Sequence, residues 1–224
     1  MVHLLNLNTI FRSMIVSKLP RLKKSTAFEG RKGPVLLIIM DGVGNGKQDD
    51  SDGVYLADTP TLDSLKKSKL YTEMLTHGPA VGLPTYDDMG NSEVGHNTLG
   101  AGRILPKGAL LVQQSIDNGN IYQGDTWKKL LKNCKTHQST LHFIGLLSDG
   151  NVHAHCGHLF SLLKEAKQTD QKRVRVHILL DGRDVAGRSA LHYLEQLNDV
   201  LDEINANPDF DYKIASGGGR MHIT

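Results

Sequence analysis

Four short apolar segments of this chain each run toward a cluster of polar side chains. The polar clusters are Asp41, Ser148-Asp149, Arg183-Asp184 and Arg220. The apolar segments are typical of buried strands in a parallel sheet, and they are Val35–Met40, Leu141–Leu147, Arg173–Leu180 and Tyr212–Ala215. In open α/β sheets, ligands bind beyond the carboxyl ends of the strands. The spacing therefore predicts one site, or two neighbouring sites, at the end of a sheet.

Asp41 lies in Met-Asp-Gly-Val-Gly, directly after the first of these segments. A carboxylate at a strand end is a suitable ligand for a hard divalent cation. The glycines allow a tight turn and a close approach of a ligand. An ordinary Asp-Gly turn would have the same sequence, so the residue alone does not decide between the two.

Ser92 lies in the segment Gly-Asn-Ser-Glu-Val-Gly-His, residues 90–96. Gly90 permits a tight turn, and Ser92 could then open a helix whose backbone amides favour a bound phosphate. Near a metal ion, the serine hydroxyl could act as a nucleophile toward phosphorus. The simpler alternative is a serine N-cap, with Glu93 complementing the helix dipole.

Arg183 and Arg220 follow two different predicted strands. Arginine forks suit carboxylate and phosphate oxygens, and the glycines 217–219 would leave backbone amides open to the same anion. Asp184 could accept a proton from a substrate hydroxyl, or it could simply orient Arg183. The alternative for the arginines is that both are ordinary surface residues.

Three histidines and a cysteine gather in Val-His-Ala-His-Cys-Gly-His, residues 152–158. The spacing is not that of an ordinary structural zinc site. We expect His153 to donate to an anionic substrate just beyond a strand end. His155 and His158 are expected at the start of the following helix.

Helical patterns separate the predicted strands. Apolar residues share one helical face at 159, 162, 163 and 166, and again at 191, 194, 197, 201 and 204. A shorter helix is predicted over Thr126–Lys132, with Asp125 as its cap. Residues 77–108 are rich in Gly, Pro and Asp with little periodicity, which is typical of a functional segment. Strands alternating with helices predict an α/β fold with a largely parallel sheet.

Composition excludes several classes of protein. The chain has 224 residues, a net charge of +2 and two cysteines, so no disulfide framework organises it and a reducing compartment is expected. Residues 1–33 hold seven basic residues and one acid, which leaves the rest mildly acidic, without a basic face for nucleic acid. The apolar runs are too short to span a membrane. The basic leader is either an organelle-targeting segment or a disordered extension, with Met14 as an alternative start.

Taken together, these segments resemble the cofactor-independent phosphoglycerate mutases, over nearly all of residues 34–224. The matching pieces, in order, are Met40–Gly44, Gly82–Pro84, Asp88–His96, Gly100–Arg103, Gly145–Gly150, Asp181–Asp184 and Ser216–Met221. The resemblance implies part of an alkaline-phosphatase-like domain followed by part of an inserted α/β phosphotransferase domain. Its expected division is a leader at 1–33, a metal-binding portion at 34–106 and a substrate-binding portion at 107–224.

The resemblance also implies roles for individual residues. Asp41 and Ser92 match metal ligands, and Ser92 matches the serine that is transiently phosphorylated. His153, Arg183, Asp184 and Arg220 match substrate-binding positions, with Asp184 placed to handle the glycerate hydroxyl proton.

The reaction implied is the interconversion of 3-phosphoglycerate and 2-phosphoglycerate through phosphoserine. Two divalent ions would serve it, manganese first and magnesium or cobalt as alternatives, without 2,3-bisphosphoglycerate. The implied protein is a cytoplasmic monomer that acts on a small molecule.

Family members are much longer, and their remaining metal ligands lie in a C-terminal half. Asp41 and Ser92 are too few to hold two ions, so we expect the 224-residue chain to be inactive as a mutase and to expose apolar surface on residues 34–75. Two alternatives stay open. The chain could be another metal-dependent phosphatase or phosphomutase of the alkaline phosphatase superfamily, or a non-catalytic remnant that needs a C-terminal half.

Overall fold

The computed structural model describes residues 22–223, and the chain divides into two compact units between Asp58 and Thr59. In the described part of the first unit, the short helix α2 (Gly53–Leu56) begins where the Asp52 side chain accepts a hydrogen bond from the Tyr55 amide. Most of the predicted leader lies outside the described residues. Its described part, residues 22–33, is exposed and forms no helix or strand.

The predicted strand Val35–Met40 does not form. The six apolar side chains are between 49% and 83% exposed, and residues 22–58 contain no strand. A parallel strand needs a neighbour for its backbone groups and cover on both faces, and residues 22–58 offer neither. The strand prediction is therefore wrong here, whereas the expected exposure of apolar surface within residues 34–75 is confirmed. Further exposed residues are Tyr55, Leu56, Leu65, Leu70, Met74 and Leu75.

The second unit begins with α3 (Pro60–Lys66) and the short 3-10 helix η1 (Gly78–Val81). Helix α4 (Ser92–Ala101) follows, so the stretch predicted to be irregular contains a helix of ten residues. Val94 of α4 packs with Val81 and Leu83 in a small core of its own. Helices α5 (Gly108–Asp117), α6 (Asn120–Gln123) and α7 (Asp125–Thr136) lead to the sheet. The cap of α7 is Gly124, and Asp125 is its first residue, so the predicted Asp125 cap is wrong.

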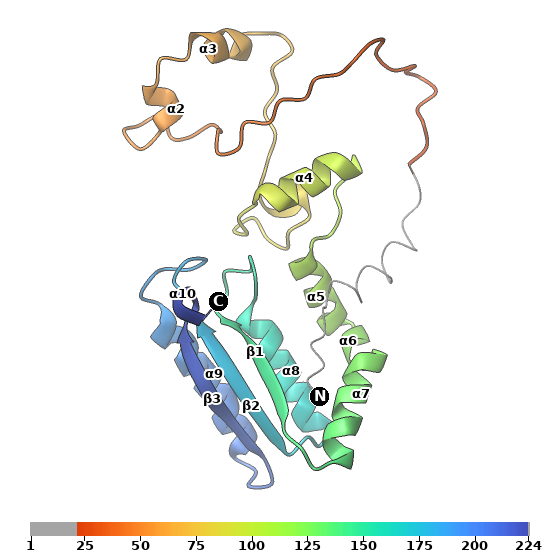
Figure 1. Ribbon diagram of the computed structural model, residues 1–224, viewed down its shortest axis with the longest axis vertical. Helices are drawn as coiled ribbons and strands as arrows, with labels where there is room; N and C mark the ends of the chain where they lie inside the picture. The colour runs from red at the N-terminus through yellow and green to blue at the C-terminus, as the bar shows by residue number, and fades with distance from the viewer. Residues whose placement is uncertain (1–21, 224) are drawn as a thin grey trace. The chain divides into compact units, whose positions relative to one another are not determined.

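The sheet has three parallel strands in the order β1-β2-β3 (Figure 1). Strands β1 (Leu141–Leu147) and β2 (Arg173–Leu180) have the predicted bounds. Strand β3 (Asp211–Gly219) is longer than predicted, because the glycines 217–219 pair with β2. Helix α8 (Cys156–Gln168) connects β1 to β2, and helix α9 (Ala190–Asn205) connects β2 to β3. The chain ends in α10 (Arg220–Ile223). The predicted α/β fold with a parallel sheet is confirmed.

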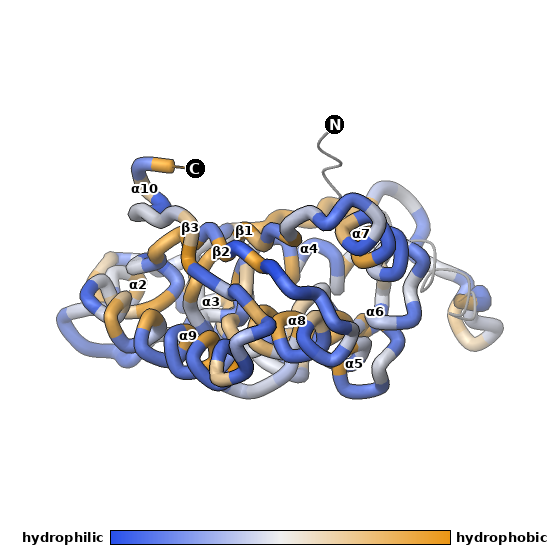
Figure 2. The backbone as a smooth tube through the Cα atoms, turned by 90° about the horizontal axis from the view of Figure 1, so that it is seen from below, coloured by the Kyte–Doolittle hydropathy of each residue, from blue (hydrophilic) through white to orange (hydrophobic). Residues whose placement is uncertain are grey.

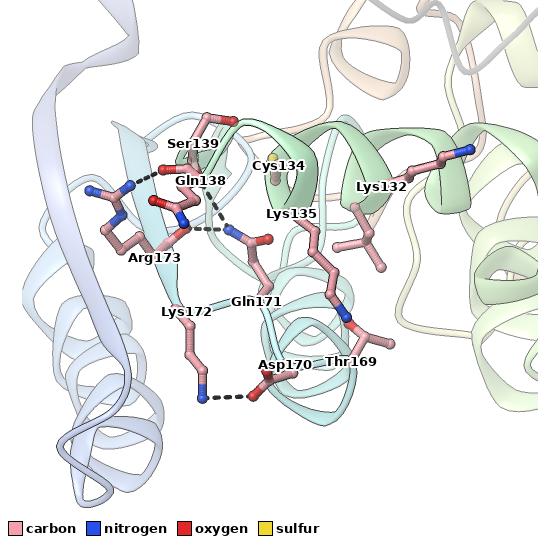
Figure 3. A pocket seen from close by; sticks show the side chains of 11 residues that line it. Lys132, Cys134, Lys135, Gln138, Ser139, Thr169, Asp170, Gln171, Lys172 and Arg173 are labelled. Atoms are coloured by element: carbon pink, nitrogen blue, oxygen red, sulfur yellow. Dashed lines mark hydrogen bonds and ion pairs between the residues drawn. The ribbon is translucent and has the colours of Figure 1, made fainter.

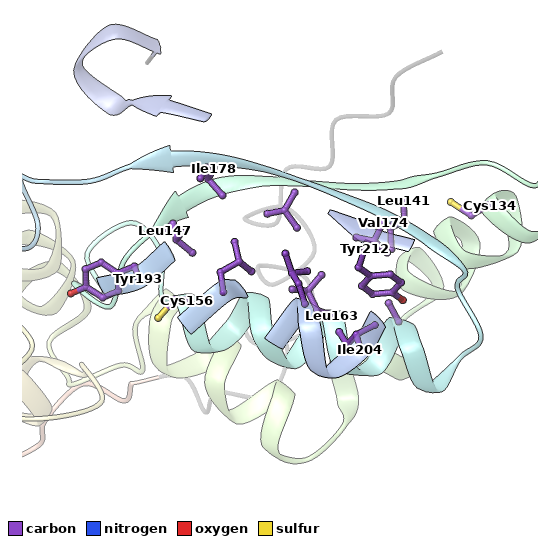
Figure 4. Close-up of a cluster of buried hydrophobic side chains, with 14 of the residues drawn as sticks. Cys134, Leu141, Leu147, Cys156, Leu163, Val174, Ile178, Tyr193, Ile204 and Tyr212 are labelled. Carbon is purple, nitrogen blue, oxygen red and sulfur yellow. The ribbon is translucent and has the colours of Figure 1, made fainter. Parts of the chain in front are cut away.

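Helices α8 and α9 cover one face of the sheet (Figure 1), and the main core lies between these helices and the sheet. Hydrophobic and hydrophilic residues alternate within each turn of both helices, because an amphipathic helix has one apolar and one polar face (Figure 2). Leu147, Val174 and Tyr212 from the strands meet Leu163 and Ile204 from the helices, each with 1% exposure or less (Figure 4). The opposite face of the sheet carries exposed side chains such as Ile144. This core holds the strand ends in a defined arrangement.

No helix formed by residues 22–223 combines the length and the apolar character that crossing a membrane requires.

Candidate active site

The carboxyl ends of all three strands meet at one edge of the sheet, and most of the predicted site residues lie there. Ser148 and Asp149 follow β1, the turn 181–184 follows β2, and Arg220 follows β3. Parallel strands necessarily place these positions side by side. The structure thus brings together His153, Asp184 and Arg220, which the sequence separates by up to 67 positions.

Asp181 is the most buried charged group of this edge. Its side chain is 1% exposed and accepts hydrogen bonds from Ser148 Oγ at 2.5 Å and from Arg220 Nη1 at 3.0 Å. It also accepts from the backbone amides of residues 182–184. Burial alone would raise the pKa of Asp181, but these donors outweigh it and hold the pKa far below its usual value. At neutral pH Asp181 is therefore an anion that organises the turn after β2.

Asp184 joins two of the predicted substrate-binding residues. Its Oδ2 lies 2.6 Å from His153 Nδ1, and its Oδ1 lies 3.0 Å from Arg220 Nη1. Because a carboxylate only accepts, His153 Nδ1 carries the hydrogen, which leaves Nε2 as an acceptor when the ring is neutral. Hydrogen bonds to Asp181 and Asp184 raise the pKa of Arg220. The Asp184 side chain is 8% exposed and that of His153 is 55% exposed, so only the histidine faces solvent broadly.

A cleft of about 640 Å³ opens over this network. Its walls come from residues 85–91 before α4, from the loops after β1 and β2, and from Arg220, the first residue of α10. His153, Arg183, Asp184 and Arg220 all line it. Arg183 is exposed and forms no ion pair with any of residues 22–223, so its guanidinium can meet an anion in the cleft. The four predicted substrate-binding residues thus share one cavity.

Ser92 is the first residue of α4, directly after the cleft-lining residues Gly90 and Asn91. The N-cap is Asn91, whose side chain accepts from the Val94 amide at 3.0 Å. The alternative reading of Ser92 as the capping serine is therefore wrong. Since Asn91 already satisfies an amide of the first turn, the Ser92 hydroxyl is not needed to start the helix. Glu93 lies in the same first turn.

Two residues of the site were missed by sequence reasoning. Asp181 stands directly after β2, a position typical of a functional carboxylate, and that signal could have found it. Tyr193 lies in α9 and donates to Asp149 Oδ1 at 2.5 Å, and burial with this bond raises the pKa of Tyr193 to about 12. Its sequence position, on the apolar face of α9 with Leu197 and Leu201, indicates only a core residue.

The glycines 217–219, predicted to leave backbone amides open to an anion, form part of a strand instead. They belong to β3, and their residues pair with Ile178, Leu179 and Leu180 of β2. A Cβ at Gly217 would lie 2.6 Å from Ile178 Cγ1, so the glycine permits close packing of the two strands.

The histidine segment is divided among different tasks. His153 contacts Asp184, while His155 caps α8 by accepting from the Gly157 amide at 3.1 Å. His158 lies in the first turn of α8, 3.1 Å from Gln113 Oε1, and burial lowers its pKa. The predicted positions of His155 and His158 at the start of a helix are confirmed.

A metal site needs more donors than the described residues bring together. Asp41 lies in an exposed turn of the first unit, and Ser92 lies in the second. Their oxygens are of the type that manganese or magnesium prefers. Yet no three His, Cys, Asp or Glu side chains of residues 22–223 are grouped to hold an ion. The donor types fit a divalent cation but do not make a site by themselves, so the metal-ligand roles stay predictions.

A second cleft, of about 390 Å³, lies where β2 begins (Figure 3). Lys132, Lys135, Lys172 and Arg173 line it, beside the carboxyl ends of α7 and α8. Lys172 pairs with Asp170 and Asp209, and Arg173 donates to the carbonyl of Gln138. Cations beside helix carboxyl ends complement the helix dipoles, which accounts for this cluster structurally.

Comparison of this chain with known proteins assigns it to a family. A family model described as the BPG-independent PGAM N-terminus matches residues 112–224. A protein of Leptospira interrogans, named a probable 2,3-bisphosphoglycerate-independent phosphoglycerate mutase, is 47% identical over 206 residues, covering 91% of this chain and 37% of that protein. The mutase of Ricinus communis is 46% identical over 192 residues, covering 85% of this chain and 34% of that protein.

A solved structure agrees with the sequence matches. Phosphoglycerate mutase of Leishmania mexicana, crystallised at low cobalt concentration, superposes with a TM-score of 0.75 and 47% identity, covering 82% of this chain and 33% of that chain. The chain thus spans about a third of the length of the relatives it matches. On the family match and these relatives, the chain belongs to the family of 2,3-bisphosphoglycerate-independent phosphoglycerate mutases, to whose N-terminal portion it corresponds.

Proposed function

We propose that this chain supplies the glycerate-binding cleft and the serine nucleophile of a phosphoglycerate mutase that interconverts 3-phosphoglycerate and 2-phosphoglycerate. The observation that carries the proposal is the joining of His153, Asp184 and Arg220 in one cleft, with Arg183 at its wall. A hydrolase would need only a phosphoryl acceptor and water. Cationic groups that grip the dephosphorylated product are useful to an enzyme that must return the phosphoryl group to it.

In this proposal the cations hold the anionic groups of the substrate. Arg183 meets a carboxylate or phosphate with its planar fork, and His153 donates or accepts at a hydroxyl. Arg220, fixed by two carboxylates, supplies a charge whose position does not change when substrate enters. Such preorganisation keeps glycerate bound while it reorients between the two half-reactions.

The covalent step uses Ser92. Its Oγ gives up its proton and forms a bond to phosphorus as the bond between phosphorus and the glycerate oxygen breaks, and that oxygen takes up a proton. In the return step the other glycerate hydroxyl attacks phosphorus and gives its proton to a base, while the bond between phosphorus and Ser92 Oγ breaks and Oγ takes up a proton again. Asp184, at the cleft and linked to His153, is the group we assign to this proton transfer.

Divalent ions, manganese first and magnesium or cobalt as alternatives, would neutralise charge on the transferring phosphoryl group, with Asp41 and Ser92 among their ligands. We also propose that the whole protein is a cytoplasmic monomer and that it acts on a small molecule. Two free cysteines, Cys134 and Cys156, agree with a reducing compartment.

Titration calorimetry of the 224-residue chain with 3-phosphoglycerate and 2-phosphoglycerate tests the cleft without requiring turnover. We expect both to bind, and Arg183→Ala and Arg220→Ala each to weaken binding about tenfold or more, because each removes a charge-assisted hydrogen bond. Lys213→Ala, an exposed cation paired with Asp211 on β3, is the matched control and should bind as wild type does. Wild-type affinity in both arginine variants, or affinity for sulfate equal to that for phosphoglycerate, would refute the proposal.

A further inference from the structure

The loop after β1, residues 149–153, is attached on two sides. On one side it packs against Asp184, because a Cβ at Gly150 would lie 2.8 Å from Asp184 Cβ and His153 hydrogen-bonds the same residue. On the other side Asn151 Nδ2 donates to Asp88 Oδ1 at 2.7 Å. Residues 63 positions apart are thereby joined across the cleft.

Asp88 is held firmly, so its bond to Asn151 can fix the position of residues 149–153 relative to the residues around Asp88. Its Oδ2 accepts from the Thr85 amide at 2.6 Å and from Thr85 Oγ1 at 2.9 Å. Its backbone oxygen accepts from the Gly78 amide at 3.1 Å. A half-buried carboxylate with this many donors keeps one orientation, because each alternative rotamer forfeits several hydrogen bonds.

The chain between Asp88 and Ser92 has little freedom. Gly90 donates its amide to His77 Nδ1 at 2.8 Å, and a Cβ at Gly90 would lie 1.9 Å from the Thr76 oxygen. Asn91 then caps α4. The position of Asp88 therefore determines where α4 and its first residue, Ser92, begin.

From these contacts we infer that Asn151 and Asp88 are positioning residues, which hold the start of α4 against the cleft that contains Asp184 and Arg220. The catalytic meaning of this placement rests on the proposed function, whereas the coupling itself does not. Asn151 has a φ of 58°, a left-handed conformation that asparagine adopts more readily than most residues. An asparagine here provides both the turn and an amide that reaches Asp88.

Hydrogen exchange of the 224-residue chain without ligand tests the coupling. Asn151→Gly keeps the left-handed backbone and removes the amide, so we expect amides of residues 88–101 to exchange about tenfold faster, while the strands β1–β3 keep their protection. Gln138→Gly, at another left-handed position with a φ of 46°, is the matched control and should leave residues 88–101 unchanged. Unchanged exchange in Asn151→Gly, or a rise spread equally over the sheet, would overturn the inference.

Interchange of the two side chains is the rescue test. Asp88→Asn combined with Asn151→Asp keeps one amide facing one carboxylate, so we expect exchange of residues 88–101 to return within about twofold of wild type. Asn151→Asp alone sets two carboxylates face to face and should accelerate exchange. If the double variant exchanges as fast as the single one, the direct bond is not the coupling element.

A ligand arm separates this inference from the proposed function. In the wild type we expect 3-phosphoglycerate to slow exchange both in residues 149–153 and in residues 88–101. In Asn151→Gly it should slow only residues 149–153, a difference that a merely stabilising contact would not produce. An equal ligand effect on 88–101 in both proteins would contradict coupling. Absence of any ligand effect would count against the proposed function and leave the unliganded result to decide the coupling.

Discussion

Single residues at the strand ends show how the cleft obtains its charge. Arg220 contacts both Asp181 and Asp184, so its charge is largely balanced inside the protein. Arg183 has no such partner among the described residues. An arginine held by two acids, such as the half-buried Arg220, provides a fixed electric field, and an exposed arginine such as Arg183 can bind an incoming anion. Two residues that look alike in the sequence therefore receive different tasks.

Replacement of Asp181 should measure the strength of the buried network. We expect Asp181→Ala to lower the free energy of unfolding by about 3 kcal/mol at pH 7, because it strips several donors of their acceptor. The pKa of Asp181 is lowered in the folded chain, so its stabilisation is present above the unfolded pKa of about 3.9 and is lost as the pH falls toward the folded value. Urea unfolding should thus show a difference in the free energy of unfolding between wild type and variant, and this difference should become smaller below about pH 4.

Asp202→Ala is the control for this measurement, since Asp202 is exposed on α9. A change of less than about 0.5 kcal/mol is expected for it. A loss in Asp181→Ala no larger than in this control would show that the Asp181 network does not stabilise the fold.

At the scale of elements, one pattern led to two outcomes. Val35–Met40 and Leu141–Leu147 are both short apolar runs that end at polar residues. The second forms β1 because β2 pairs with it and α8 covers it. Residues 22–58 contain no strand that could pair with the first, which stays exposed. A strand forms only where other strands pair with it and side chains pack on it. An apolar run in the sequence therefore shows only that a strand could form there.

The exposed run should bind an apolar dye. We expect Ile38→Lys to lower the fluorescence of a bound naphthalene sulfonate dye, because it interrupts six adjoining apolar side chains. The free energy of unfolding of the sheet, measured by thermal unfolding, should change by less than about 0.5 kcal/mol. Leu191→Lys, which replaces a single apolar side chain with 72% exposure, should reduce dye binding less. Equal fluorescence in Ile38→Lys and wild type would show that residues 35–40 are covered.

At the scale of the whole molecule, buried apolar packing is unevenly distributed. The main core joins residues 127–212 through both crossover helices and all three strands. Residues 22–58 contribute no buried apolar side chain to a core cluster. A chain so divided should open locally at its first unit long before the sheet unfolds.

Limited digestion with trypsin tests this division. We expect the earliest cuts after Lys32 and Lys47, in exposed backbone, while the region from α7 to β3 stays intact. Mass spectrometry of the fragments identifies the order. Early cleavage at Lys164 in α8 or Arg175 in β2, at the rate of Lys47, would contradict the predicted stability difference.

Much of the sheet could be read from the chain. The bounds of β1 and β2 and the apolar faces of α8 and α9 follow from local periodicity, which depends on neighbouring residues alone. Position after a strand end was enough to select His153, Arg183, Asp184 and Arg220, and the cleft contains all four. The predicted metal roles of Asp41 and Ser92 remain predictions.

By itself, then, the sequence determined the parallel α/β fold, the family and four of the residues that line the cleft, because strand ends and motifs are local features. Only the tertiary structure decided that Arg220 forms ion pairs with both Asp181 and Asp184. It also decided that Tyr193 donates a hydrogen bond to Asp149 and that Asn151 donates one to Asp88. It also decided that residues 217–219 pair as a strand and residues 35–40 do not. Each of these outcomes depends on which distant side chain or strand lies opposite, and no local pattern records that.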